Sequence, residues 1–228
     1  MQRNLTVIQM QKIINIDWNI GIKSVAEGSV DLVLTDPPYG INYRSNKRGK
    51  RHKKMQNDNN LDWLDKWVIE LKRVCKNEAH LYVFCSWHNV EVFKFFLGKE
   101  FRIKNILIWE KENHGTGDLK GDYAPKYEMI IFCSNGSKKL NGKRDCNILK
   151  SAKTKNNNHP TEKPVDLISY LIEKSTDPGD LVLDTFGGSC STAIASKQTG
   201  RNCIVFEIEV DYCNNGRKNL AGASKRLF

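Results

Sequence analysis

Residues 177–193 read DPGDLVLDTFGGSCSTA, and this stretch decides the class of fold. A short apolar run, Leu181 to Asp184, ends in a carboxylate, a loop of small residues follows, and a helical pattern begins near Cys190. In an open α/β sheet, a strand, a glycine loop and a helix start in this order form a ligand site at the carboxyl end of the strand. The loop glycines let the backbone approach a ligand closely, and the helix start offers free N–H groups. The stretch therefore predicts an α/β fold with a site beside Asp184; a tight structural turn is the alternative.

The rest of the chain alternates short apolar runs with helical patterns. The runs predict buried strands at 32–35, 80–85, 105–109, 128–133, 181–184 and 203–207, with a weaker one at 12–16. Three- and four-residue spacing of apolar side chains predicts helices at 61–75, 87–99, 164–174, 190–199 and 211–222. Such alternation predicts a mostly parallel sheet with helices on both faces. Because no convincing helix separates the runs at 105–109 and 128–133, we expect these two to form an antiparallel ribbon at one edge.

The length of 228 residues suits one large domain better than two. We expect a single domain over 1–228, with a basic loop at 40–60 and a small insertion at about 112–158. No stretch approaches the roughly 20 apolar residues that cross a bilayer, and the N-terminus leads into no apolar signal core. We therefore expect a protein without membrane contact, located in the cytoplasm.

The cysteines and histidines do not form a metal-binding pattern. Seven cysteines include no CxxC pair, and the five histidines are scattered along the chain. A structural zinc site needs such residues clustered at short spacing. We expect reduced cysteines that act as small core residues, and no structural metal.

A second motif, Asp36-Pro37-Pro38-Tyr39, follows the apolar run that ends at Thr35. A carboxylate can accept hydrogen bonds from an amino group, and the prolines lack backbone donors, which leaves rigidly placed carbonyl acceptors. The ring of Tyr39 can stack on a flat partner. The motif is suited to holding an amino group on an aromatic ring; an ordinary strand-to-loop turn is the alternative.

An acid at the end of the last predicted strand narrows the class of ligand. Glu207 follows Gly188 by nineteen residues, the place where an acid can accept both hydroxyls of a ribose. The absence of GxxxxGK[ST] counts against a P-loop NTPase, and the absence of GxGxxG counts against a dinucleotide. A nucleoside that carries an amino-acid tail fits better, and S-adenosylmethionine is such a ligand.

Positive charge is concentrated in two segments. The net charge is +10, and residues 44–54 contribute seven Lys or Arg without an acid. Residues 138–155 contribute seven more against the single acid Asp145. We interpret these segments as nucleic-acid contacts, and a solvated, disordered surface is the alternative. The candidate DNA-binding residues are Arg44, Lys47, Arg48, Lys50, Arg51, Lys53 and Lys54.

The order of the motifs resembles the β group of amino-directed DNA methyltransferases, in which the cofactor loop follows the catalytic motif. Asp36 to Tyr39 comes first, then His159-Pro160-Thr161-Glu162-Lys163-Pro164, then Asp184 to Ser189. Trp109-Glu110-Lys111 also stands where that pattern has it. The resemblance extends from about Asp17 to the C-terminal helix. It implies a Rossmann-like, mostly parallel seven-stranded sheet with one antiparallel strand and permuted motif order.

The same resemblance implies a function: site-specific transfer of a methyl group from S-adenosylmethionine to adenine N6 in DNA, after the base is flipped out, as in restriction-modification systems. The implied catalytic residues are Asp36, Pro37, Pro38 and Tyr39, with Tyr39 stacked on the base. The implied cofactor-binding residues are Asp17, Asp36, Thr161, Lys163, Asp184, Phe186, Gly187, Gly188, Ser189 and Glu207. We expect target recognition within 112–126 and 134–158, and a homodimer, because similar enzymes often pair.

Further alternatives remain open at the level of the sequence. A protein or RNA methyltransferase of this fold could also use an acid before Pro-Pro-Tyr, and the basic segments favour nucleic acid without separating DNA from RNA. Cytosine N4 is the other acceptor in this group, although its cytosine members usually carry Ser where this chain has Asp36. A non-catalytic DNA-binding relative is another alternative, because Thr185, Cys190 and Ser191 stand where the family usually has Pro, Gly and Thr. Cys190 adds a β-carbon where backbone approaches the ligand, and a positive φ there would be strained. We expect either weakened cofactor binding or a loop that adjusts while Cys190 packs against the sheet.

Overall fold

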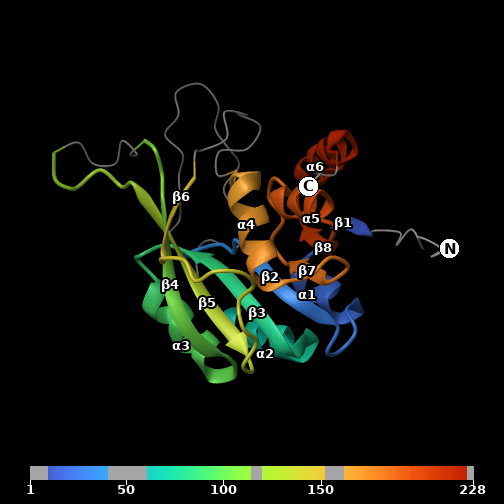
Figure 1. Ribbon diagram of the computed structural model, residues 1–228, viewed down its shortest axis with the longest axis horizontal. Coiled ribbons are helices and arrows are strands. Elements are labelled where there is room, and N and C mark those ends of the chain that lie inside the picture. Colours follow the sequence, from blue (N-terminus) through green and yellow to red (C-terminus); the bar gives the residue numbers. More distant parts are fainter. Residues whose placement is uncertain (1–9, 41–60, 114–119, 152–161, 225–228) are drawn as a thin grey trace.

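The computed structural model describes residues 10–40, 61–113, 120–151 and 162–224, and these form one central sheet covered by helices (Figure 1). Its strands are β1 Gln11–Asn15, β2 Val30–Thr35, β3 Cys75–Cys85, β4 Arg102–Glu110, β5 Tyr127–Asn135, β6 Ile148–Lys150, β7 Leu181–Asp184 and β8 Asn202–Glu207. Its helices are α1 Trp18–Gly21, α2 Leu64–Val74, α3 Val90–Glu100, α4 Val165–Ser175, α5 Ser191–Thr199 and α6 Val210–Gly222, with a 3₁₀ turn, η1, at Ile22–Ser24.

Across the described residues the strand order is β1-β8-β7-β2-β3-β5-β4-β6. Strand β5 runs antiparallel to both of its neighbours, β3 and β4, and the other pairs are parallel. The prediction of a mostly parallel α/β sheet with one antiparallel strand is confirmed. The predicted number of seven strands is wrong, because β6 adds an eighth from a part of the expected insertion at about 112–158 where we predicted no strand. Strand β6 pairs with β4 and so takes the edge position that we assigned to the β4–β5 ribbon.

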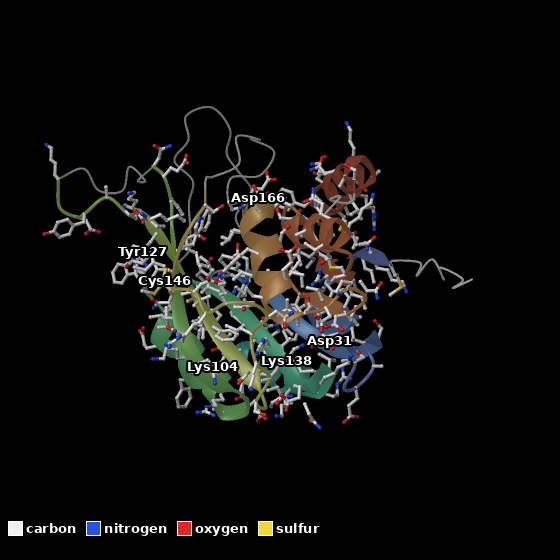
Figure 2. All side chains as sticks on the ribbon, in the orientation of Figure 1. Asp31, Lys104, Tyr127, Lys138, Cys146 and Asp166 are labelled. Atoms are coloured by element: carbon white, nitrogen blue, oxygen red, sulfur yellow. The ribbon has the colours of Figure 1, made fainter. Side chains whose placement is uncertain are left out.

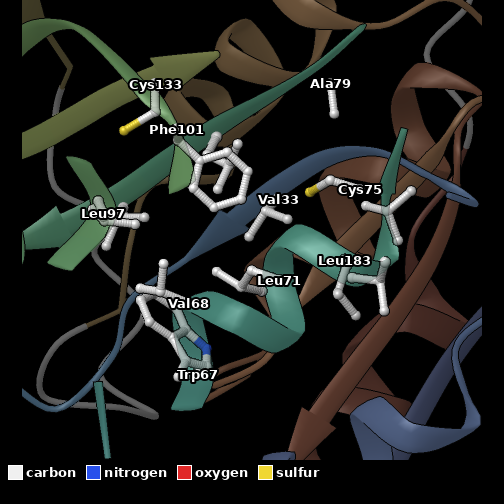
Figure 3. Close-up of a cluster of buried hydrophobic side chains, with 14 of the residues drawn as sticks. Val33, Trp67, Val68, Leu71, Cys75, Ala79, Leu97, Phe101, Cys133 and Leu183 are labelled. Carbon is white, nitrogen blue, oxygen red and sulfur yellow. The ribbon is translucent and has the colours of Figure 1, made fainter. Parts of the chain in front are cut away.

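Each face of the sheet has its own apolar core. Helices α1, α2 and α3 pack on one face, and α4, α5 and α6 pack on the other. Helix α2 presents Trp67, Val68 and Leu71 at the predicted spacing, and Figure 3 shows them beside Val33 and Leu183 of the sheet. The sheet is thus buried on both faces, so its free surface near a site lies at the strand ends.

The β4–β5 hairpin projects from the body of the molecule (Figure 1). Tyr127 opens β5 at the base of this projection (Figure 2), and Tyr123 ahead of it is almost fully exposed. Within the described residues, no helix has the length and apolar content that a membrane span requires.

Candidate active site

The two motifs from distant parts of the sequence end on neighbouring strands. Strands β2 and β7 pair in parallel, with Val33 opposite Leu183, so both motifs leave the sheet at the same edge. Thr35 Oγ1 donates a hydrogen bond of 2.8 Å to Asp184 Oδ1. The residue before Asp36 is therefore bound directly to the residue that starts the glycine-loop motif.

Asp36 holds two side chains at its two carboxylate oxygens. The Tyr39 hydroxyl donates a short hydrogen bond to Oδ1, and Lys163 Nζ lies 2.6 Å from Oδ2. Burial raises the pKa of Asp36, whereas the Lys163 ammonium acts to lower it. The carboxylate is thus oriented, with Oδ2 on an ammonium and Oδ1 on a neutral hydroxyl that a ligand can replace.

Lys163 lies between two acids and is almost completely buried. Its Nζ is 2.9 Å from Glu128 Oε2, and the other oxygen of Glu128 is 2.6 Å from Lys111 Nζ. Although burial opposes ionisation, these two ammonium groups hold the pKa of Glu128 down to about 2. Our sequence reasoning missed Glu128. The only signal was an acid at the start of a predicted strand.

The loop after β3 borders the Asp36 motif. Asn89 Nδ2 donates a 2.6 Å hydrogen bond to the carbonyl of Tyr39. Within this loop Trp87 and His88 stack with ring centroids 3.9 Å apart, and Trp87 is 54% exposed. The sequence patterns did not identify this exposed aromatic pair at the edge of the site.

The glycine loop is held by the acid at the end of β8. Gly188 N–H donates a 2.6 Å hydrogen bond to Glu207 Oε2, and Glu209 N–H donates to Oε1 at 2.8 Å. Burial raises the pKa of Glu207 in spite of these bonds. Glu207 therefore lies beside Gly188 and fixes the loop, and its expected contact with a ribose stays a prediction.

Cys190 adopts the left-handed conformation, with φ at 59°. Its side chain is fully buried and packs over Gly216 of α6, where an added β-carbon would lie 2.5 Å from Cys190 Sγ. The loop therefore accommodates Cys190 by turning its side chain into the core. The other two residues that differ from the usual family pattern, Thr185 and Ser191, also have hydrogen-bond partners. Trp67 Nε1 donates to Thr185 Oγ1, and the hydroxyls of Ser191 and Ser189 are hydrogen-bonded to each other.

Phe186 belongs to a cluster of aromatic rings at the same edge. Its ring centroid lies 5.4 Å from that of Trp63 and 6.3 Å from that of Trp18. Nearby, Asp17 caps α1 by accepting a hydrogen bond from the Asn19 N–H. Among the described residues, Trp63 Nε1 and Asn19 Oδ1 are buried without a hydrogen-bond partner. The unpartnered indole N–H of Trp63, within this cluster of rings, suits a flat heterocycle that offers an acceptor atom.

Some predicted site residues lie outside the described residues: Thr161 and the basic residues of 44–54. The remaining cofactor candidates, Asp17, Asp36, Lys163, Asp184, Phe186, Gly187, Gly188, Ser189 and Glu207, follow or border the ends of β1, β2, β7 and β8. The acids and the lysine among them all contact protein groups in this structure; Lys163 Nζ meets Asp36 and Glu128, and Asp184 accepts hydrogen bonds from Thr35, Phe186 and Thr192.

Comparison with known proteins gave consistent matches over most of the chain. The model of a family described as DNA methylase matches residues 30–218. DNA adenine methyltransferase YhdJ from Escherichia coli (strain K12) is 29% identical, covering 95% of this chain and 84% of that protein. Type II methyltransferase M2.MboI from Moraxella bovis is 28% identical, covering 82% of this chain and 78% of that protein.

Solved structures match as well. The crystal structure of the M1.HpyAVI-SAM complex has a TM-score of 0.74 at 25% identity, covering 92% of this chain and 100% of that one. The cytosine-N4-specific PvuII DNA methyltransferase has a TM-score of 0.75 at 18% identity, covering 94% of this chain and 92% of that one. At that identity the second match shows a shared fold.

Proposed function

The chain belongs to the DNA methylase family, and we propose that it transfers the methyl group of S-adenosylmethionine to the N6 amine of adenine in DNA. The observation that carries the proposal is the hydrogen bond between Thr35 and Asp184. It makes the amine-binding motif at Asp36 and the glycine loop at Phe186 neighbours at one sheet edge. An acceptor base and a methyl donor held by these two motifs would meet between them.

The residues at the glycine loop fit the donor. Phe186 and Trp63 are only partly buried and offer aromatic surface, and the unpartnered N–H of Trp63 suits an acceptor nitrogen of an adenine ring. Phe186, Gly187, Gly188 and Ser189 would hold the methionine part, with Glu207 and Asp17 on the nucleoside. The free N–H groups at the start of α5 suit its carboxylate. When bound, S-adenosylmethionine supplies a methyl group on a positively charged sulfur.

Asp36 and the Pro37 carbonyl prepare the amine. The lone pair of an adenine amine is delocalised into the ring, which makes it a poor nucleophile. Two acceptors for the amine protons shift electron density back onto nitrogen and stabilise the positive charge that develops there. Pro37 and Pro38 fix the backbone that presents these acceptors.

Tyr39 has to change partner when a base arrives. Its hydroxyl occupies Asp36 Oδ1, the oxygen that does not face Lys163. We propose that the amine replaces this hydroxyl and that the Tyr39 ring then stacks on the flipped base. Flipping costs a few kcal/mol, which stacking helps to offset.

DNA is the proposed partner, and the charge distribution supports this. We propose that the basic residues of 44–54 contact phosphates and that target recognition lies in 112–126 and 134–158, within a single domain that acts as a homodimer. Tyr123, which lies between β4 and β5 and is almost fully exposed, is available to such contacts.

The test is incubation with labelled S-adenosylmethionine and mixed-sequence DNA, followed by digestion to nucleosides. N6-methyladenine is the expected product. N4-methylcytosine would select the cytosine alternative, and the absence of any product would favour a non-catalytic DNA-binding protein.

Asp36→Ala should retain cofactor binding and lose methyl transfer by about 100-fold or more, because an acceptor of the amine is removed. Tyr39→Phe is the matched control. It keeps the stacking ring and removes the hydroxyl that competes for Asp36, so it should stay active. Full activity of Asp36→Ala would contradict the assigned role of Asp36.

A further inference from the structure

Four alternating charges form a continuous row that ends at the catalytic carboxylate. The row runs Lys111, Glu128, Lys163, Asp36, and its successive N–O distances are 2.6, 2.9 and 2.6 Å. The four residues come from the ends of β4 and β2, the start of β5, and the segment before α4. Because β5 is antiparallel, its first residues lie at the same edge as the carboxyl ends of its neighbours.

The row is not explained by stability alone. Removing charges from water costs several kcal/mol per ion, and a buried ion pair is often no more stable than apolar residues of similar size. The side chain of Lys163 is only 9% exposed, and its ammonium also lies over the Phe84 ring at 5.0 Å. A buried ammonium at this position has a functional explanation if it orients the neighbouring carboxylate of Asp36 and changes its charge state.

Lys163 has opposite effects on Asp36. It fixes Oδ2 and leaves Oδ1 toward Tyr39, which orients the carboxylate. Its positive charge also weakens Asp36 as a hydrogen-bond acceptor for an amine that becomes positive during the reaction. Glu128 offsets that charge at 2.9 Å and holds the ammonium in place.

We propose that Glu128 is a positioning residue for methyl transfer: it holds Lys163 against Oδ2 of Asp36 and offsets the lysine charge, so that Oδ1 remains an effective acceptor for the target amine. The inference rests on the proposed function and assigns no contact between Glu128 and substrate. Lys111 completes the row by pairing with the outer oxygen of Glu128.

The sign of the pH effect follows from the charges around Asp36. Burial raises its pKa, Lys163 lowers it, Glu128 raises it, and hydrogen bonds from Lys163 and Tyr39 lower it. Asp184 and Cys85 also lie close enough for Asp36 to influence their titration. Removing the charge of Glu128 therefore lowers the pKa of Asp36. Removing Lys163 together with Glu128 raises it, because Lys163 has the larger effect.

The experiment measures kcat, KM for DNA, the dissociation constant for S-adenosylmethionine and the pH profile of kcat. Glu128→Gln should lower kcat about ten- to a hundredfold, the range for a misplaced catalytic group. It should leave cofactor binding unchanged and move the acidic limb of the profile to lower pH. Glu128→Gln with Lys163→Met should also have a low kcat, but its acidic limb should move to higher pH.

Glu110→Gln is the matched control, because Glu110 pairs with Lys126 and Lys150 on the exposed side of β4. It should leave kcat and the profile at wild-type values. A wild-type kcat in Glu128→Gln, or a lower kcat with an unmoved acidic limb in both variants, would overturn the positioning role. If the wild-type protein itself forms no methylated base, the proposed function is wrong. That result differs from a failure of the positioning role, in which the wild type is active and the Glu128 variants do not behave as expected.

Discussion

At the scale of single residues, Asp184 places an ionisable group inside the protein next to the site. Its side chain is buried, and it accepts hydrogen bonds from Thr35, Phe186 and Thr192. These donors are neutral, and burial raises the pKa of Asp184 to about 6 in spite of them. The charged form of this carboxyl is therefore less stable in the fold than in water.

A raised pKa makes folding stability depend on pH. The carboxyl of Asp184 has a pKa of about 3.9 in the unfolded chain and about 6 in the fold. Its contribution to the free energy of unfolding is therefore fully present below about pH 3.9 and is lost as pH rises through about 6. Asp184→Asn cannot ionise. Between about pH 5 and about pH 7.5, the wild type should lose about 1 kcal/mol of unfolding free energy relative to this variant. Urea titrations at both pH values measure the difference, and parallel changes in the two proteins would contradict the prediction.

The positions of site residues were predictable from the sequence where a side chain ends a strand. Asp36 and Glu207 follow apolar runs, so their place at the sheet edge follows from the pattern. Glu128 was not predictable, since its partner Lys163 is thirty-five residues away and belongs to another element. Their contact depends on β5 being inserted between β3 and β4, which no local pattern specifies.

At the scale of elements, the start of α5 packs against α6 where the Cys190 side chain lies over Gly216. An added β-carbon at Gly216 would lie 2.5 Å from Cys190 Sγ and 2.7 Å from its Cβ. Gly216→Ala should therefore cost about 1–3 kcal/mol of unfolding free energy, as overpacked cores do. Thermal or urea unfolding measures this cost.

The pair should be coupled. Cys190→Gly removes both crowding atoms and relieves the positive φ, and the next atom near the added β-carbon is Ile13 Cδ1 at 3.5 Å. In the Cys190→Gly background, Gly216→Ala should lose most of its cost, which a double-mutant cycle detects. Additive effects would show that the contact does not limit packing. Cofactor affinity should change little in Cys190→Gly, because the cysteine side chain is turned into the core.

Helices and strands were predictable when the segment was long enough to show a repeating pattern of apolar residues. Helix α2 was expected over 61–75 and spans Leu64–Val74, and β7 has the predicted bounds. Strand β6 has three residues, Ile148–Lys150, within a run of polar and basic residues. Three residues show no period of two, and this strand forms because β4 offers an open edge, which is a tertiary cause.

At the scale of the whole molecule, the effect of the net charge of +10 on DNA binding depends on where the positive residues lie as well as on their number. Residues 44–54 supply seven positive charges without an acid, and the segment begins a few residues after the Asp36 motif. Charges that neutralise DNA phosphates release counterions, so each such charge steepens the fall of affinity with salt. Charges that contact no phosphate contribute only to the long-range field.

This difference can be measured with two variants of equal charge. Replacing Arg48, Lys50 and Arg51 with Gln should reduce the slope of log affinity against log salt by about 0.9 for each phosphate that is no longer neutralised, hence by up to about 3. The control replaces Lys23, Lys99 and Lys104 with Gln, and these are exposed residues of η1, α3 and β4. Lys104 lies near the start of β4, toward the sheet edge opposite the site (Figure 2). The slope of the control should stay at the wild-type value, because its net charge changes equally while the phosphates remain neutralised. Equal salt slopes for the two variants would mean that DNA affinity depends only on the total charge of the protein. Residues 44–54 would then make no direct phosphate contacts of their own.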